Sequence, residues 1–319
     1  METVLALKGV TRRYGETVAL DDLSFDIPSG SAVALLGPNG AGKTTTVGLL
    51  MGLAAADAGT VSVCGTTPRA AVASGRIAAM LQDSGLMPGA TVGELVELAR
   101  RCAPDPLPAA EALELSGLSG LARRRTDRLS GGQAQRLKFA LVAAANPRIL
   151  VLDEPTRALD VQARAQFWEA MRAYAAGGRT ILFATHYLDE VDRNAGRVLV
   201  MSRGRIVADG TPAQLRERSG LSVVGFRLDG PRAEDAAEAL AALPGSVAVD
   251  GDRVSVHTAD PDAAVRALAA GPLSWHSLSI AAPSLEESFL SLTAASGPGP
   301  DSVLTASPSP TSPTYHEEL

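Results

Sequence analysis

Residues 37–44, Gly-Pro-Asn-Gly-Ala-Gly-Lys-Thr, constrain the fold more than any other stretch of this chain. They match the pattern G-x-x-x-x-G-K-[ST] in full. An apolar run at 31–36 precedes them and a stretch of helical character at 44–51 follows. A glycine-rich loop between a buried strand and a helix is typical of an open α/β sheet. The alternative is a glycine-rich turn that matches by chance, and its strand and helix context argues against that.

Each residue type in the loop has a physical role toward phosphate. Gly40 and Gly42 let the backbone wrap tightly, so that several N–H groups point at phosphate oxygens. The helix that follows directs its positive N-terminus at the same anion. Lys43 is expected to neutralise the β- and γ-phosphates, and the Thr44 hydroxyl to bind Mg²⁺. Lysine occurs only three times while every other basic residue is arginine, so a lysine retained at this position indicates a specific requirement.

A second segment supplies acids. Residues 149–154, Ile-Leu-Val-Leu-Asp-Glu, predict a buried strand that ends in Asp153 and Glu154. Ligands bind at this end of parallel strands, so Asp153 is expected to hold Mg²⁺ and Glu154 to polarise the attacking water. Two acids that merely cap a strand are the simpler interpretation. Together the two segments indicate binding and hydrolysis of a nucleoside triphosphate. Kinases, GTPases and helicases share these two segments, so they do not identify the class of enzyme.

Composition limits the class of partner and the compartment. With 319 residues the chain is long enough for two domains, and its net charge of −6 argues against a nucleic-acid partner. The one short basic run, 123–125, is interpreted as a solvated surface. Cys64 and Cys102 have no metal-like spacing and are interpreted as small buried hydrophobes in a reducing cytosol. Neither a signal peptide nor an apolar window of about 18 residues is found, so no transmembrane helix is expected.

Strands and helices alternate over the first two thirds of the chain. This predicts an α/β fold with a mostly parallel core sheet, an antiparallel β subdomain and an all-helical lobe between 91 and 145. Strands are expected at 4–7, 23–27, 31–36, 60–63, 76–81, 149–152 and 180–184, with a hairpin at 197–201 and 205–209. Helices are expected at 44–51, 91–101, 109–117, 130–145 and 161–175.

The pattern changes near residue 220. Strand 222–228, helix 232–243, strands 246–250 and 253–258, helix 261–270 and strand 274–280 follow a β-α-β-β-α-β order. This predicts a small α+β, ferredoxin-like domain over 220–295 after a nucleotide-binding domain over 1–219. A terminal helix is expected at 284–292 with Ser284 as its N-cap, and residues 296–319 are expected to form a disordered Pro/Ser-rich tail.

Residues 129–133, Leu-Ser-Gly-Gly-Gln, discriminate among the nucleotide-hydrolysing classes. They lie between the loop at 37–44 and the acids at 153–154, and in this order the chain resembles the ATP-binding subunits of ABC transporters from residue 4 to about 215. The resemblance implies a P-loop NTPase fold, with ATP and Mg²⁺ as cofactors. It also implies that 129–133 is the family signature, which covers the γ-phosphate bound by a second copy.

The resemblance also assigns roles to single residues. Gln82 corresponds to the Q-loop glutamine, Asp160 belongs to the D-loop, His186 is the switch histidine, and Tyr14 stacks on adenine. Taken singly, each has a simpler interpretation, such as a packed tyrosine or a histidine at a helix start. The implied catalytic residues are Glu154, His186 and Gln82, and the implied metal ligands are Thr44, Gln82 and Asp153. The implied nucleotide contacts are Tyr14, Gly37, Pro38, Asn39, Gly40, Ala41, Gly42, Lys43, Thr44, Thr45, Ser130, Gly131, Gly132, Gln133 and Asp160.

The resemblance implies two protein partners and a place in the cell. These are a second copy of the chain in an ATP-sandwich dimer and an integral-membrane permease that docks over 82–100, at the cytoplasmic face of the membrane. One departure from the family pattern is Arg157-Ala158, where Ser or Asn and then Gly usually stand in the D-loop. The departure lies beside the expected contact between the two copies and removes no catalytic group.

The end of the second domain narrows the subclass. Residues 284–290, Ser-Leu-Glu-Glu-Ser-Phe-Leu, are similar to the end of daunorubicin-resistance exporter ATPases, which implies export of a drug, antibiotic or lipid-like molecule. One alternative is a polysaccharide exporter, although its C-terminal domain is usually a β-sandwich. Another is a soluble ABC ATPase that acts on ribosomes or DNA, although these usually carry two cassettes or a long coiled coil.

Overall fold

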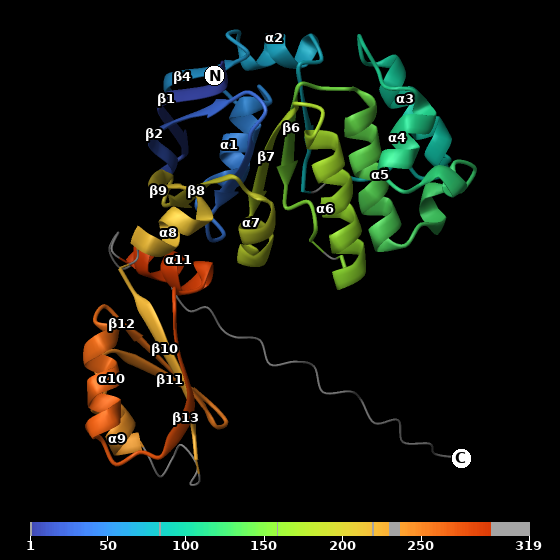
Figure 1. Ribbon diagram of the computed structural model, residues 1–319. Helices are drawn as coiled ribbons and strands as arrows, with labels where there is room; N and C mark the ends of the chain where they lie inside the picture. The colour runs from blue at the N-terminus through green and yellow to red at the C-terminus, as the bar shows by residue number, and fades with distance from the viewer. Residues whose placement is uncertain (1, 83, 158, 219, 230–236, 295–319) are drawn as a thin grey trace, which may run out of the picture.

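The computed structural model describes residues 2–82, 84–157, 159–218, 220–229 and 237–294. Figure 1 shows a larger N-terminal body of sheets and helices, and a smaller C-terminal sheet with helices on one side. The larger body is of the α/β class and the smaller one is of the α+β class.

A sheet of six strands forms the centre of the larger body, in the order β5-β6-β7-β3-β8-β9. All neighbours are parallel except β9, which pairs antiparallel with β8. Both faces of the sheet are buried, which explains why the inner strands are continuously apolar. The strands are β3 (Ala32–Leu36), β5 (Ile77–Met80), β6 (Ile149–Asp153), β7 (Thr180–Thr185), β8 (Arg197–Ser202) and β9 (Arg205–Gly210).

Different elements cover the two faces of the central sheet. On one face, Val33 and Leu35 pack in a cluster with α1 (Lys43–Leu50) and with a three-stranded antiparallel sheet. On the other face, Ala34 and Leu36 pack with helices that follow the sheet strands. The three-stranded sheet consists of β1 (Thr3–Tyr14), β2 (Thr17–Pro28) and β4 (Ala58–Val63). The helices on the second face include α5 (Gly131–Ala144), α6 (Val161–Ala175), α7 (Leu188–Asn194) and α8 (Pro212–Arg218).

The helical lobe predicted between 91 and 145 is confirmed. It contains α3 (Val92–Arg101), α4 (Ala109–Leu115) and α5, which lie together in Figure 1. These three helices share a separate apolar cluster. Thr91 begins α3 with a capping box, because its hydroxyl accepts from the Glu94 backbone while the Glu94 carboxylate accepts from the Thr91 backbone. The prediction of a buried cysteine is wrong for Cys102, which is exposed directly after α3, where the polar end of that helix meets solvent.

Several elements were missed or predicted too short. The helices α2 (Pro68–Ala73), α7 and α8 have six or seven residues, too few to establish a helical period. Strands β1 and β2 extend well beyond the predicted 4–7 and 23–27. Repeated register shifts along the β1–β2 pair interrupt the alternation of apolar and polar residues on which the prediction depends.

The smaller body has the ferredoxin-like topology that the sequence predicts. Its four antiparallel strands lie in the order β11-β12-β10-β13, and α10 (Pro261–Ala270) covers one face. This single sheet is not a β-sandwich. The strands are β10 (Ser222–Leu228), β11 (Ser246–Asp250), β12 (Arg253–Thr258) and β13 (Trp275–Ala281). Of the helix predicted at 232–243, α9 (Ala237–Ala241) is described, while 232–236 and the tail predicted from 296 lie outside the described residues.

The last helix, α11 (Leu285–Ala294), returns to the larger body. Leu285 is 4% exposed and joins, with Phe289, the apolar cluster that contains Leu215 of α8. Figure 1 shows α11 beside α8, below the central sheet. The predicted N-cap is confirmed, because the Ser284 hydroxyl accepts from the Glu287 backbone N–H. Across the part of the chain that the structure describes, no helix combines the length and apolar character needed to span a bilayer.

Candidate functional site

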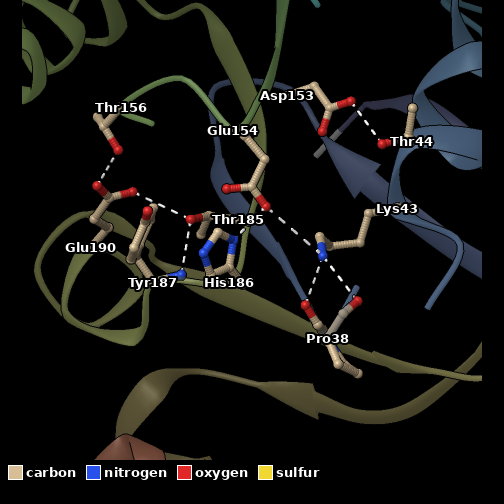
Figure 2. Close-up of polar contacts among 11 residues, drawn as sticks. Pro38, Lys43, Thr44, Asp153, Glu154, Thr156, Thr185, His186, Tyr187 and Glu190 are labelled. Carbon is tan, nitrogen blue, oxygen red and sulfur yellow. Dashed lines mark hydrogen bonds and ion pairs between the residues drawn. The ribbon is translucent and has the colours of Figure 1, made fainter. Parts of the chain in front are cut away.

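The loop between β3 and α1 holds a buried lysine. Lys43 is 6% exposed, and its ammonium donates to the carbonyl oxygens of Gly37 at 2.7 Å and Pro38 at 3.1 Å (Figure 2). Burial lowers the pKa of Lys43, while the nearby carboxylates of Glu154 and Asp153 counteract the shift. The loop carbonyls hold the Lys43 ammonium in a position where it can also bind a phosphate group.

Two glycines in this loop have backbones in the left-handed region. Gly40 has φ of 79° and Gly42 has φ of 104°. A Cβ on Gly42 would lie 2.7 Å from the Ala19 carbonyl oxygen, and one on Gly37 would lie 2.5 Å from the Met201 carbonyl oxygen. The loop therefore requires glycine at these positions. The first N–H groups of α1 have no carbonyl one turn earlier and remain for an anion.

A hydroxyl and a carboxylate meet beside the loop. The Thr44 hydroxyl donates to Asp153 Oδ2 at 3.0 Å (Figure 2). Asp153 is 1% exposed at the end of β6, and Thr44 lies in the first turn of α1. Oxygen donors of these two kinds are those that Mg²⁺ prefers, so the residues present fit this ion.

Glu154 and His186 form a second polar pair. Nδ1 of His186 lies 2.8 Å from Oε1 of Glu154, and Lys43 Nζ lies 3.9 Å from the same oxygen. Glu154 is 6% exposed, and among the described residues its Oε2 atom has no hydrogen-bond partner. A buried acceptor next to a phosphate-binding loop is suited to receive a proton or to orient a water molecule.

These elements surround one pocket of about 600 Å³. It brings together the phosphate loop, Gln82 two residues after β5, Glu154 and His186. Arg157, the departure from the family pattern, also lines it. The full lining is Thr17, Val18, Ala19, Asn39, Gly40, Gly42, Lys43, Thr44, Thr45, Gln82, Glu154, Arg157, His186 and Tyr187.

Tyr14 lies outside this lining. It ends β1, is 50% exposed and has the Arg12 guanidinium 4.7 Å from its ring centroid. The start of β2, at 17–19, lines the pocket instead. Sequence reasoning missed this segment, because Thr17, Val18 and Ala19 carry no chemical signature.

The segment 129–133 also lies outside the pocket. Ser130 begins α5 as its N-cap, and Gln133 completes a capping box with it. Asp160 similarly begins α6, where its carboxylate accepts from the Ala163 backbone N–H at 2.7 Å. Within one chain the structure therefore separates these polar helix starts from the phosphate loop.

Glu190 is a buried acid that sequence reasoning did not identify. It is 2% exposed and accepts hydrogen bonds from the hydroxyls of Thr156 and Thr185 (Figure 2). Burial raises the pKa of Glu190, and the Thr156 and Arg164 contacts offset part of that shift. A glutamate in a short helix gives no sequence signal of its burial.

Comparison with known proteins identifies the family. The family model described as ABC transporter matches residues 20–157. The chain is 37% identical over 294 residues to the Nod factor export ATP-binding protein I of Burkholderia lata, covering 90% of this chain and 95% of that protein. It is 36% identical over 307 residues to the daunorubicin resistance ATP-binding protein DrrA3 of Streptomyces coeruleorubidus, covering 92% and 96%.

Solved structures agree with the sequence relatives. The ADP conformation of MJ1267, an ATP-binding cassette of an ABC transporter, matches with a TM-score of 0.60 and 26% identity over 66% of this chain and 92% of that one. The dimeric structure of MJ0796, a bacterial ABC transporter cassette, matches with a TM-score of 0.59 and 27% identity over 65% and 98%. With the site described above, these matches confirm the predicted family: this chain belongs to the ABC transporter family as one of its ATP-binding, ATP-hydrolysing subunits.

Proposed function

We propose that this chain energises an exporter as a dimer of two copies, with ATP and Mg²⁺ bound between the loop 37–44 of one copy and residues 130–133 of the other. The observation that carries the proposal is a pocket lined by Lys43, Gln82, Glu154 and His186, while Ser130 lies elsewhere in the same chain. The pocket of one chain is therefore a half-site, because it lacks the signature residues 130–133. A second copy has to supply them. The dimeric cassette among the structural relatives supports this assembly.

The residues of the half-site divide the binding work. The backbone N–H groups at the start of α1 and the Lys43 ammonium bind the β- and γ-phosphates. Thr44, Asp153 and Gln82 hold Mg²⁺, which neutralises charge on the phosphate oxygens. Tyr14 contacts the adenine from the end of β1, next to the pocket wall at 17–19.

Glu154 and His186 carry the hydrolytic step. Glu154 orients and polarises a water molecule in line with the γ-phosphorus, and the unpartnered Oε2 atom supports this role. His186 Nδ1, 2.8 Å from Glu154 Oε1, fixes the carboxylate. Catalysis then depends mainly on positioning and on electrostatic stabilisation of the phosphoryl group.

A membrane permease is the second partner in this proposal, and it holds the subunit at the cytoplasmic face of the membrane. The region 82–100 is the docking surface, since it connects Gln82 in the pocket with α3 of the lobe and includes Met87, which is 58% exposed. The cargo is a drug, antibiotic or lipid-like molecule, in line with relatives named for Nod factor export and daunorubicin resistance.

The domain division is also a proposal. We assign 1–219 to the nucleotide-binding domain, 220–295 to the accessory domain and 296–319 to a Pro/Ser-rich tail. Separate apolar clusters in the two bodies support the first boundary. The packing of α11 on α8 gives the accessory domain a direct contact with the ATPase.

The experiment compares Glu154→Gln with Lys43→Ala in the purified full-length chain. Glu154→Gln is expected to bind Mg-ATP without hydrolysing it and to accumulate as a dimer, measured by light scattering after size exclusion. Lys43→Ala is the control, because it removes the cation that holds the phosphates and should prevent both ATP binding and dimer formation. A Glu154→Gln protein that stays monomeric at saturating Mg-ATP would contradict the proposal.

A further inference from the structure

Arg164 contacts the end of the D-loop from the first turn of α6. Its Nη2 atom donates to the Leu159 carbonyl oxygen at 3.5 Å. Leu159 directly precedes Asp160, which caps the same helix. The Arg164 side chain is about one-third exposed. A movement of the D-loop therefore moves an oxygen that Arg164 binds.

The same guanidinium also faces the buried acid. Arg164 Nε lies 3.4 Å from Glu190 Oε1. Glu190 in turn joins Thr156, two residues after Glu154, to Thr185, directly before His186. These contacts connect the D-loop to the ends of β6 and β7, which the proposed hydrolytic residues directly follow.

A stack of side chains extends from Arg164 to His186. The Arg164 Cζ atom lies 5.1 Å from the ring centroid of Tyr187, and the Tyr187 ring lies 4.1 Å from that of His186. The Tyr187 backbone is fixed, because its N–H donates to the Thr185 hydroxyl at 3.0 Å. Figure 2 shows Tyr187 between Glu190 and His186.

We infer that Arg164 is a positioning residue that couples the D-loop to the His186 ring through Tyr187 and Glu190. The inference rests on the proposed function, in which two copies enclose the ATP and His186 fixes Glu154, and on the expected position of the D-loop at the contact between the copies. Correct placement of the D-loop then keeps Arg164 over Tyr187, and Tyr187 holds the His186 ring toward Glu154. Hydrolysis in one half-site in this way responds to the approach of the partner copy.

A simpler role for Arg164 is to balance the buried charge of Glu190. The two roles differ in what Arg164→Lys does. Lysine keeps a positive charge near Glu190, but its single ammonium cannot lie over the Tyr187 ring, approach Glu190 and donate to the Leu159 carbonyl at once, as the forked guanidinium does. Charge balance survives this substitution, whereas the stack does not.

The test measures steady-state ATP hydrolysis and thermal unfolding of the full-length chain. For Arg164→Lys we expect kcat to fall about tenfold, the size typical of one lost charge-assisted contact, with the KM for ATP and the melting temperature unchanged. Tyr187→Leu, which removes the ring between Arg164 and His186, should reproduce the fall in kcat.

Arg172 provides the matched control. It lies on the same helix and donates to Asn194 of α7 at 2.7 Å, away from the Tyr187 stack, so Arg172→Lys should behave as wild type. The inference is overturned if Arg164→Lys retains wild-type kcat, or if the melting temperature falls together with kcat. Glu154→Gln is measured alongside. If Glu154→Gln loses activity while Arg164→Lys does not, this inference fails and the proposed ATP site stands.

Discussion

Substituting Gly42 of the phosphate loop should lower the melting temperature more than substituting Gly40 of the same loop. In Gly42→Ala the new Cβ lies 2.7 Å from the Ala19 carbonyl oxygen and 2.8 Å from Met201 Cε, at a backbone φ of 104°. In Gly40→Ala the φ is 79° and the structure places no described atom within 4 Å of the new Cβ. The pair therefore separates steric overlap from backbone strain within a single loop.

The magnitudes follow from these two contributions. The left-handed backbone costs alanine about 1–2 kcal/mol at either position. Overlap with the carbonyl of β2 and with Met201 adds about 1–3 kcal/mol in Gly42→Ala alone. Because about 1 kcal/mol shifts the melting temperature of a domain of this size by about 2–4 °C, Gly42→Ala should melt about 5 °C below Gly40→Ala.

The assay is thermal unfolding of the nucleotide-free full-length chain, followed by circular dichroism. Ala19 also lines the nucleotide pocket, so Gly42→Ala should weaken ATP binding more than Gly40→Ala in a fluorescent ATP titration. Equal melting temperatures for the two variants, or a lower one for Gly40→Ala, would refute the steric argument.

Two further outcomes are expected. Burial raises the pKa of Tyr174 to about 12 from 10.0, so the unfolded chain loses the phenol proton at a lower pH than the folded protein does. The contribution of Tyr174 to the free energy of unfolding is therefore complete below pH 10 and is lost as the pH rises through 12. Between these values the wild type should lose up to about 3 kcal/mol of stability that Tyr174→Phe does not lose, measured by urea unfolding at each pH; parallel curves would contradict this. Ser130→Arg should leave ATP binding to the single chain measurable in a fluorescence titration but abolish phosphate release, because Ser130 is proposed to act on the partner's ATP; full turnover would rule out that role.

The sequence alone predicts the elements whose chemistry is local. A glycine pattern, a lysine and a hydroxyl within 37–44 specify a phosphate loop, because backbone conformation and donor type are properties of adjacent residues. The continuous apolar strands before Gly37 and Asp153 indicate a sheet buried on both faces. The β-α-β-β-α-β order after 220 likewise predicts the sheet order that the structure has.

Contacts between distant segments were decided only by the tertiary structure. The wall of the pocket at 17–19, the burial of Glu190 against Thr156, and the return of Leu285 to the first body have no local signature. Whether such a side chain is buried depends on which remote helix covers it, and its own neighbours in sequence do not specify that helix. The sequence therefore determined the phosphate-binding chemistry and the fold class, while packing decided which other side chains reach that chemistry, because burial and contact are properties of the whole folded chain.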